Sequence, residues 1–215
     1  MSTYARKALL ITHISLSVGW LGAVAAFLVL GIAGVTSADA DLVRAVYLAM
    51  NPLGQFLIVP LSIAALVTGI IQSLVTRWGL FDFYWVVVKL ILTIGATLLL
   101  LLHQFTAVSE AARLAAEVAI GTPPEIGALG TKLLEDAALA VLVLTIVTAV
   151  SVLKPWGRTV YGQRRVDSVQ PGHDRANLSA GLPAGLKMFA AVLGASVLAL
   201  AIIRHVGGGG MSHHH

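Results

Sequence analysis

Three ionisable side chains lie inside long apolar stretches of the sequence: His13, Lys89 and His103. Such groups are costly in hydrocarbon, so in a membrane protein they are candidate functional residues. A helical rise of about 1.5 Å per residue puts His13 and Lys89 each roughly two turns from the same side of a membrane. The same rise puts His103 about 21 Å beyond Lys89, near the other surface. The sequence therefore predicts that His13 and Lys89 share one leaflet.

An aromatic side chain accompanies each of these two residues. In a helix, His13, Ser17 and Trp20 fall on one stripe, because they are spaced four and seven residues apart. Trp85 precedes Lys89 by four residues and shares its face. Small residues form the opposite stripe of the first helix and predict close packing against a neighbour there; they are Ser15, Gly19, Gly22 and Ala26.

A histidine on one helix that faces a second nitrogen donor on another can hold a haem iron inside a helix bundle. The neutral amine of a lysine is an adequate second ligand. The rings of Trp20 and Trp85 would then flank the macrocycle. Haem propionates need cations, and three lie at the nearby membrane edge: Arg6, Lys7 and Arg77. This pattern predicts haem b with His13 and Lys89 as iron ligands.

Each group also has an ordinary structural interpretation. A membrane histidine can simply hydrogen-bond to a neighbouring helix, and the long side chain of Lys89 can extend to the interface. Trp20 and Trp85 can be packing residues or interfacial anchors. His103 near the outer surface is typical of an interfacial residue, although a second site there is conceivable. The common depth of an imidazole and an amine on different helices favours the functional interpretation.

The elements that must position these residues are membrane helices. The chain is 58% hydrophobic and 11% charged, whereas a soluble domain carries about 25% charged residues. No charged residue occurs from Ala8 to Val35, and about 20 apolar residues are enough to span a bilayer. We predict an all-α polytopic membrane helix bundle, a four-helix core plus one, with five spans: 8–35, 53–75, 83–105, 133–153 and 186–203.

Prolines and polar residues mark the ends of these spans. The alternating stretch 37–51 is typical of a surface helix, and the second span contains Pro60. The third span is predicted to continue as a helix to Glu117, before the break at 123–124. The fourth stops at 154–155. Residues 1–206 are thus predicted to form one membrane-embedded domain, and 207–215 look like a linker and purification-tag remnant.

The distribution of basic residues predicts the orientation. With a cytoplasmic N-terminus, nine Lys and Arg side chains lie on the inner side and four on the outer side, which matches the positive-inside rule. The inner nine are Arg6, Lys7, Arg77, Lys154, Arg158, Arg164, Arg165, Arg175 and Lys187. This topology explains the net charge of +4, so no nucleic-acid partner is predicted.

Several kinds of chemistry have no basis in the sequence. The chain has no cysteine, which excludes disulfides, thiolate metal sites and thiol redox chemistry. There is no phosphate-binding loop and no HExxH zinc motif. The basic N-terminus with its long apolar run predicts a first membrane helix, because the run is too long for a signal peptide.

The order of motifs carries a family resemblance. His13 and Trp20, then Pro60 with Thr68-Gly69, then Trp85 and Lys89, then His103 resemble the membrane-bound protoporphyrinogen oxidases of the HemJ type. The pattern is also similar to CopD-type copper-resistance membrane domains and to uncharacterised bacterial integral membrane proteins near both. The HemJ resemblance implies that His13 and Lys89 bind haem b, with Thr68 and Gly69 beside them.

Three functions from different classes follow as hypotheses. The first is a b-type haem protein of the bacterial cytoplasmic membrane, for electron transfer or for porphyrin or quinone oxidation. The second is a transporter that handles copper or another metal, although Cu(I) prefers thiolate and thioether ligands. The third is a non-catalytic subunit of a membrane complex. Predicted partners are membrane lipids, a quinone or porphyrin, and a second copy or another membrane redox protein.

Overall fold

The chain folds entirely into helices and loops across the residues described by the computed structural model, 2–76, 79–154, 157–169 and 187. Four stretches in this part of the chain are long and apolar enough to cross a membrane: Thr3–Thr36, Ala40–Val75, Tyr84–Glu117 and Gly127–Leu153. The prediction of an all-α polytopic membrane bundle is therefore confirmed. The predicted fifth span, 186–203, lies outside the described residues.

The first and fourth spans are single α-helices. The second and third spans are each continuous, but each contains one short π-helical segment. The elements in chain order are α1 (Thr3–Thr36), α2 (Ala40–Leu53), η1 (Gly54–Ile58), α3 (Val59–Val75), α4 (Tyr84–His103), η2 (Gln104–Val108), α5 (Ser109–Glu117), α6 (Gly127–Leu153) and α7 (Val160–Val169). The two short elements η1 and η2 are π-helical turns. The predicted continuation of the third span to Glu117 is confirmed.

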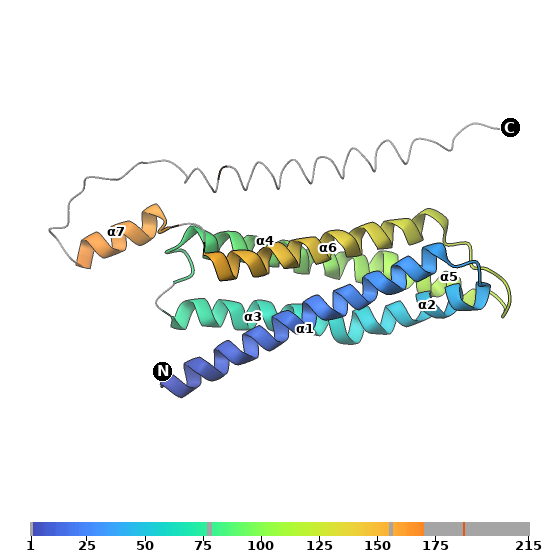
Figure 1. Cartoon of the computed structure of the whole chain (residues 1–215), viewed down its shortest axis with the longest axis horizontal. Coiled ribbons are helices and arrows are strands. Elements are labelled where there is room, and N and C mark those ends of the chain that lie inside the picture. Colours follow the sequence, from blue (N-terminus) through green and yellow to red (C-terminus); the bar gives the residue numbers. More distant parts are fainter. Residues whose placement is uncertain (1, 77–78, 155–156, 170–186, 188–215) are drawn as a thin grey trace.

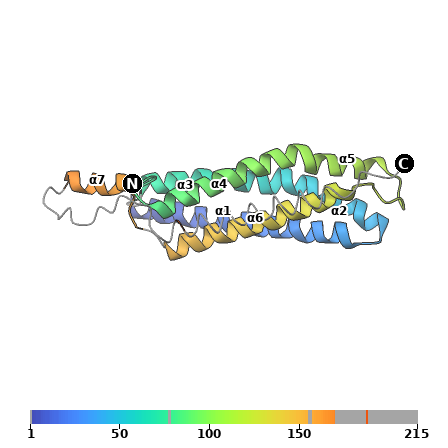
Figure 2. The same ribbon diagram turned by 90° about the horizontal axis from the view of Figure 1, so that it is seen from above.

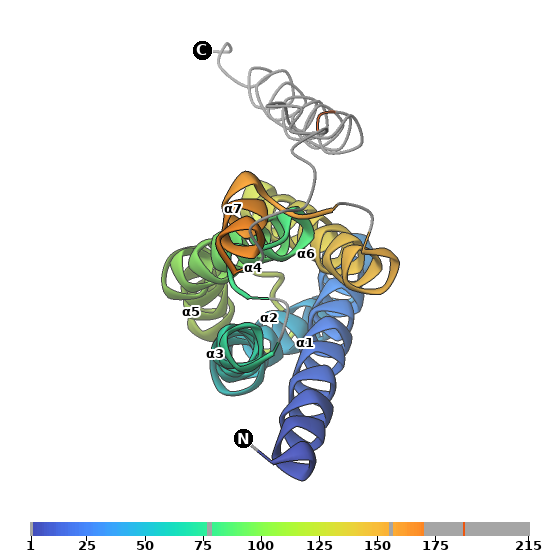
Figure 3. The ribbon, with the colours of Figure 1, turned by 90° about the vertical axis from the view of Figure 1, so that its left-hand side faces the viewer.

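The four spans form four helical rods: α1, α2–η1–α3, α4–η2–α5 and α6. These rods lie side by side along the long axis of the molecule (Figures 1 and 2). At the end that carries the N-terminus, α1 packs against α3 and α6, and α4 packs against the same two helices. Figure 3 shows this ring of helices seen from that end. Consequently α1 and α4 stand at opposite corners, and their side chains meet across the centre of the bundle.

The main core lies in the middle and opposite half of the bundle. Its buried side chains come from every long rod and include Trp20, Phe27, Met50, Ile58 and Leu144. A smaller cluster of Trp85, Val86 and Val150 lies near the N-terminal end. Many other large apolar side chains are exposed on the outside of the rods, which is the surface that lipid covers in a membrane.

The segment 37–51 is not a separate surface helix. Helix α2 starts at Ala40, capped by Asp39, and runs without a break into η1 and α3. It buries Val46, Tyr47 and Met50 against the bundle. Tyr47 fits between two glycines, since a Cβ at Gly34 would lie 3.0 Å from its ring and a Cβ at Gly130 would overlap its hydroxyl. The alternating polarity of this segment reflects one buried face.

The small-residue stripe of α1 does not pack inside the bundle, so that prediction was wrong. Ser15, Gly22 and Ala26 are exposed, and a Cβ at Gly22 would touch nothing within 4 Å. Gly19 alone approaches another helix, at Leu61 of α3. The buried stripe is instead the one with His13, Trp20 and the larger apolar residues, because these side chains reach the bundle centre.

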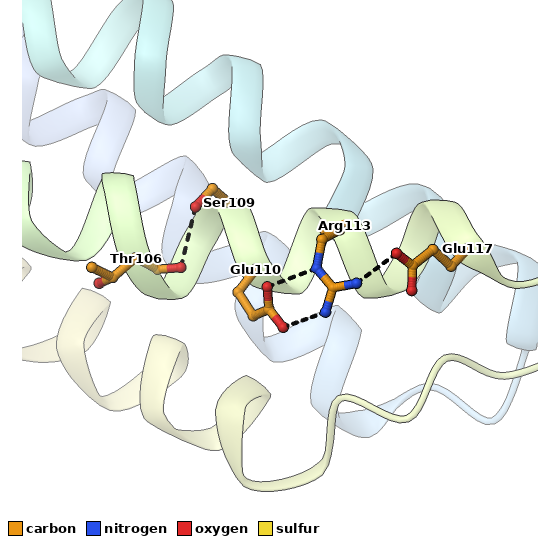
Figure 4. A network of polar contacts seen from close by, with 5 residues as sticks. All are labelled: Thr106, Ser109, Glu110, Arg113 and Glu117. Carbon is orange, nitrogen blue, oxygen red and sulfur yellow. Dashed lines mark hydrogen bonds and ion pairs between the residues drawn. The ribbon is translucent and has the colours of Figure 1, made fainter.

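Polar contacts lie at both ends of the bundle, outside the apolar region. At the end opposite the N-terminus, Arg113 of α5 binds Glu110 at 2.6 Å and Glu117 at 2.5 Å (Figure 4). At the N-terminal end, Thr159 donates to the Phe81 carbonyl oxygen at 2.6 Å, which ties the start of α7 to the loop before α4. Helix α6 stops where Lys154 takes a left-handed conformation with φ of 46°.

Candidate functional site in the His13 cavity

A cavity of about 640 Å³ lies between α1, α3, α4 and α6 near the N-terminal end of the bundle. We call it the His13 cavity. His13, Lys89 and Trp85 line it, together with Gly69 of α3. Cavities of roughly 300–1,000 Å³ are the usual size of small-molecule sites. Because His13 and Lys89 line the same cavity, they lie at the same depth in the bundle, as the sequence predicts.

His13 is held in one orientation by Thr68. The Thr68 hydroxyl donates to the Ala64 carbonyl oxygen of its own helix at 2.7 Å. Its oxygen lies 3.0 Å from Nδ1 of His13 and, having already given its proton to the carbonyl, accepts there. Nδ1 of His13 therefore carries the proton, and Nε2 of the neutral ring is an acceptor.

Nε2 of His13 points across the bundle at Lys89. The Lys89 Nζ atom lies 3.4 Å from Nε2. This contact joins α1 to α4, the two helices at opposite corners of the ring. His13 is 8% exposed although it is polar. Two basic nitrogen atoms, His13 Nε2 and Lys89 Nζ, thus lie close together inside the cavity. Such a pair can ligate a metal or accept a proton.

Gly69 makes room for the imidazole. A Cβ added at Gly69 would lie 3.0 Å from Cε1 of His13, which is closer than ordinary van der Waals contact. Thr68 and Gly69 therefore act together on the same ring: one orients it through a hydrogen bond, and the other lets it approach α3. Both residues were predicted to lie beside His13.

Cations line the His13 cavity at the end nearest the N-terminus of the chain. Arg6 and Lys7 of α1 and Lys154 after α6 contribute to its lining. The Lys154 ammonium stands 5.9 Å from the ring centre of Trp85, within the range of a cation–π interaction. Arg77, the third predicted cation, lies outside the described residues. An apolar ligand with anionic groups would meet charges of the right sign here.

Trp20 and His103 do not belong to this cavity. Both line a second cavity of about 400 Å³, farther from the N-terminal end, which we call the His103 cavity. His103 Nδ1 lies 3.3 Å from Oδ2 of Asp136 on α6. The prediction that Trp20 flanks the same ligand as His13 is thus not supported by its position, because two turns of α1 separate the two side chains along the bundle.

Sequence reasoning missed the residues around the two π-turns. Gln104, the first residue of η2, is 2% exposed. Its Nε2 donates to Asn51 Oδ1 at 2.9 Å, and a Cβ at Gly54 would overlap its Oε1. The only signal in the sequence is the amide itself, a polar side chain within an apolar helix. The π-turns that bring η1 and η2 together left no local signal.

Comparison with protein-family models, with curated proteins and with solved structures finds no match to this chain. The resemblance to HemJ-type and CopD-type proteins therefore stays a prediction. Among the described residues, no group of three or more His, Cys, Asp or Glu side chains is arranged to hold a metal ion.

Proposed function

We propose that this chain is a b-type haem protein of the bacterial cytoplasmic membrane, acting in electron transfer or in porphyrin or quinone oxidation. The observation that carries the proposal is the orientation of His13. Its Nδ1 is fixed by Thr68, so Nε2 presents a lone pair to the cavity, 3.4 Å from the Lys89 amine. Metal-binding histidines are commonly fixed in this way through their other nitrogen.

The residues of the His13 cavity fit such a group on three grounds. Two nitrogen donors suffice for haem, because the porphyrin supplies the other four ligands, and this agrees with the lack of a three-residue metal cluster in the described chain. The cavity walls are mostly apolar, and Arg6, Lys7 and Lys154 stand at its open end. Lys89 has a flexible, unbranched stem, so its amine can exchange the contact with His13 for another partner.

A bound haem would supply a reversible one-electron centre. The chain's own residues would do four things around it. His13 and Lys89 would hold the iron from opposite helices. Thr68 would keep the histidine in its ligating tautomer, and Trp85 would cover the open end. The apolar walls would exclude water, which shifts a redox potential by lowering the local dielectric.

An absorption spectrum of full-length protein from haem-sufficient cells tests the proposal. We expect a Soret band in the oxidised protein and sharpened visible bands on reduction. His13→Ala should lose the Soret band, because it removes the best-oriented ligand. His103→Ala is the matched control, since it removes the other membrane histidine of the described helices and should leave the band unchanged.

Two results would contradict haem binding at this site. Colourless wild-type protein that elutes as a folded species would do so directly. A Soret band that survives His13→Ala but is lost in His103→Ala would move the cofactor to the other cavity. Lys89→Met, which keeps the length of the side chain and replaces the amine by a thioether, should retain haem with an altered spectrum if Lys89 is a ligand.

The copper hypothesis has less support. It would require a polar or sulfur-containing path across the membrane. The methionines before the tail are only Met1, Met50 and Met188, and Met50 is buried in the apolar core. We therefore do not propose metal transport. A non-catalytic subunit would leave the cavity around His13 without a ligand, and the spectrum distinguishes that case as well.

A further inference from the structure

The His103 cavity contains buried hydrogen-bonding groups that the proposed haem site does not use. Trp20 and Gln104 line it and are 4% and 2% exposed. Among the described residues, neither the Trp20 Nε1 donor nor the Gln104 Oε1 acceptor has a hydrogen-bond partner. Buried polar atoms are nearly always paired, so two orphans in one cavity point to a ligand with polar atoms.

The orientation of the Gln104 amide follows from its neighbours. Its Nε2 donates to the Asn51 carbonyl oxygen at 3.3 Å and to Asn51 Oδ1 at 2.9 Å. A backbone carbonyl can only accept, so the nitrogen of the amide must face Asn51. Oε1 then lies on the other side of the group, beside Gly54, and it needs a donor.

His103 and Asp136 form a buried pair in the same cavity. The Nδ1 atom of His103 lies 3.3 Å from Oδ2 of Asp136. The two side chains are only 16% and 11% exposed. On two other residues of the wall, an acceptor, Gln104 Oε1, and a donor, Trp20 Nε1, lack a partner among the described residues.

The rest of the cavity wall is apolar. It consists mainly of leucine, isoleucine, valine and alanine side chains of α4 and α6, with Gly95 in their midst. A ligand that fits has an apolar body or tail and a small head that both donates and accepts hydrogen bonds. A phospholipid acyl chain would fill the apolar part and leave the buried polar atoms of Trp20 and Gln104 unpaired.

We propose that the His103 cavity binds the headgroup of a membrane hydroquinone and prefers it to the oxidised quinone. A hydroquinone hydroxyl can donate to Gln104 Oε1, and its oxygen can accept from Trp20 Nε1. A quinone carbonyl only accepts, so it would leave Gln104 Oε1 without a donor. The site is separate from His13, and only its use as an electron source for the haem rests on the proposed function.

Titration calorimetry on the full chain in lipid nanodiscs, under anaerobic conditions, tests this site with a decyl-substituted benzoquinol. We expect the reduced probe to bind about tenfold more tightly than the oxidised one, the effect of roughly one hydrogen bond. Gly95→Leu should abolish binding, because Gly95 lines the cavity and a Cβ there meets nothing within 4 Å, so the larger side chain fills the space.

Gly22→Leu is the matched control. Like Gly95, Gly22 is an exposed helical glycine whose Cβ would touch nothing within 4 Å, but it lines neither cavity. It should bind the probe as the wild type does. Trp20→Phe should weaken binding of the reduced probe about tenfold by removing the only predicted donor. All variants are compared after they elute as folded, monodisperse protein.

Three results would overturn the proposal: no binding of the reduced probe, unchanged binding in Gly95→Leu, or equal competition by decanol, which has the tail without the ring. The last would mean a lipid-chain pocket. His13→Ala should still bind the probe. If the Soret band is missing but the probe still binds, only the proposal of haem binding is contradicted. If a Soret band depends on His13 but the probe does not bind, only the proposed hydroquinone site is contradicted.

Discussion

The hydroxyl of Thr68 decides which nitrogen of His13 can act on a ligand. It donates to a carbonyl of its own helix and accepts from Nδ1, so a single proton arrangement satisfies all three groups. The imidazole also lies against Gly69, without any side chain between the ring and α3. Two neighbouring residues on α3 therefore control both the tautomer and the position of a residue on α1.

Removing the Thr68 hydroxyl should weaken haem binding without removing a ligand. In Thr68→Val, Nδ1 loses its acceptor and the ring loses its preferred tautomer. Loss of such supporting hydrogen bonds costs about 10- to 100-fold in metal affinity, and haem titration of the protein freed of haem measures it. Thr145→Val is the control, because the Thr145 hydroxyl donates only to Val141 of its own helix. Equal affinities in both variants would remove Thr68 from the site.

Adding one carbon at Gly69 should displace the His13 ring. The Cβ of Gly69→Ala would lie 3.0 Å from Cε1, so the imidazole must shift by a few tenths of an ångström. We expect partial haem occupancy and a shifted Soret maximum in purified protein. Gly22→Ala, where a Cβ meets nothing within 4 Å, should retain the wild-type spectrum. An unchanged spectrum in Gly69→Ala would show that the ring has room to spare.

At the scale of elements, the two π-turns set how the second and third rods meet. Each inserts an extra residue into its helix, as the bond from the Val59 N–H to the Gly54 carbonyl oxygen shows. Pro60 is the second residue after η1, and it has no backbone N–H to donate to the helix. The turns η1 and η2 contact each other, and this places Gln104 against Gly54 and Asn51. Such turns often occur at functional sites.

The contact between the π-turns should be sensitive to one methyl group. In Gly54→Ala, the Cβ would overlap Gln104 Oε1, and Gln104 cannot move freely because Asn51 holds its other end. Overpacking of this kind costs about 1–3 kcal/mol, more than the roughly 1 kcal/mol that alanine gains over glycine in a helix. Unfolding titrations in mixed detergent micelles measure the difference.

Gly95→Ala gives the opposite sign at a comparable position. It also lies in a membrane helix, but its Cβ would meet nothing within 4 Å. We expect a stability equal to or slightly above that of the wild type. If Gly54→Ala and Gly95→Ala had the same free energy of unfolding, the close approach of Gln104 to Gly54 would be wrong.

At the scale of the whole molecule, the bundle has two chemically different ends. The N-terminal end carries Arg6, Lys7 and Lys154 around the His13 cavity. The opposite end carries the loop 118–126 and the ion pairs of Arg113 with Glu110 and Glu117. The positive-inside rule predicts that the N-terminal end faces the cytoplasm, so the His13 cavity would open inward and His103 would lie toward the outer surface.

Cysteine labelling tests this orientation without background, because the chain contains no cysteine. Ser2→Cys and Ala119→Cys place single thiols at exposed positions of opposite ends. A membrane-impermeant maleimide is added to cells whose outer membrane is permeabilised and whose cytoplasmic membrane is intact. It should label Ala119→Cys and leave Ser2→Cys unlabelled. Labelling of Ser2→Cys alone would invert the predicted topology.

The membrane helices, their approximate ends and the shared depth of His13 and Lys89 could be predicted from the amino-acid sequence alone. These follow from local quantities: the length of apolar runs, the rise per residue and the positions of prolines. The prediction that Thr68 and Gly69 lie beside His13 came from motif order, and the structure agrees with it.

Which face of each helix points inward could not be predicted from the sequence and follows from the packing of the helices against one another. The small stripe of α1 predicted packing, yet Gly22 and Ala26 are exposed while Trp20 is buried. Trp20 and His13 share a stripe but line different cavities, because about two helical turns separate them along the bundle. The pairing of Gln104 with Asn51 depends on two π-turns meeting across helices. Such contacts depend on where four rods come together, and no local pattern in the chain encodes that.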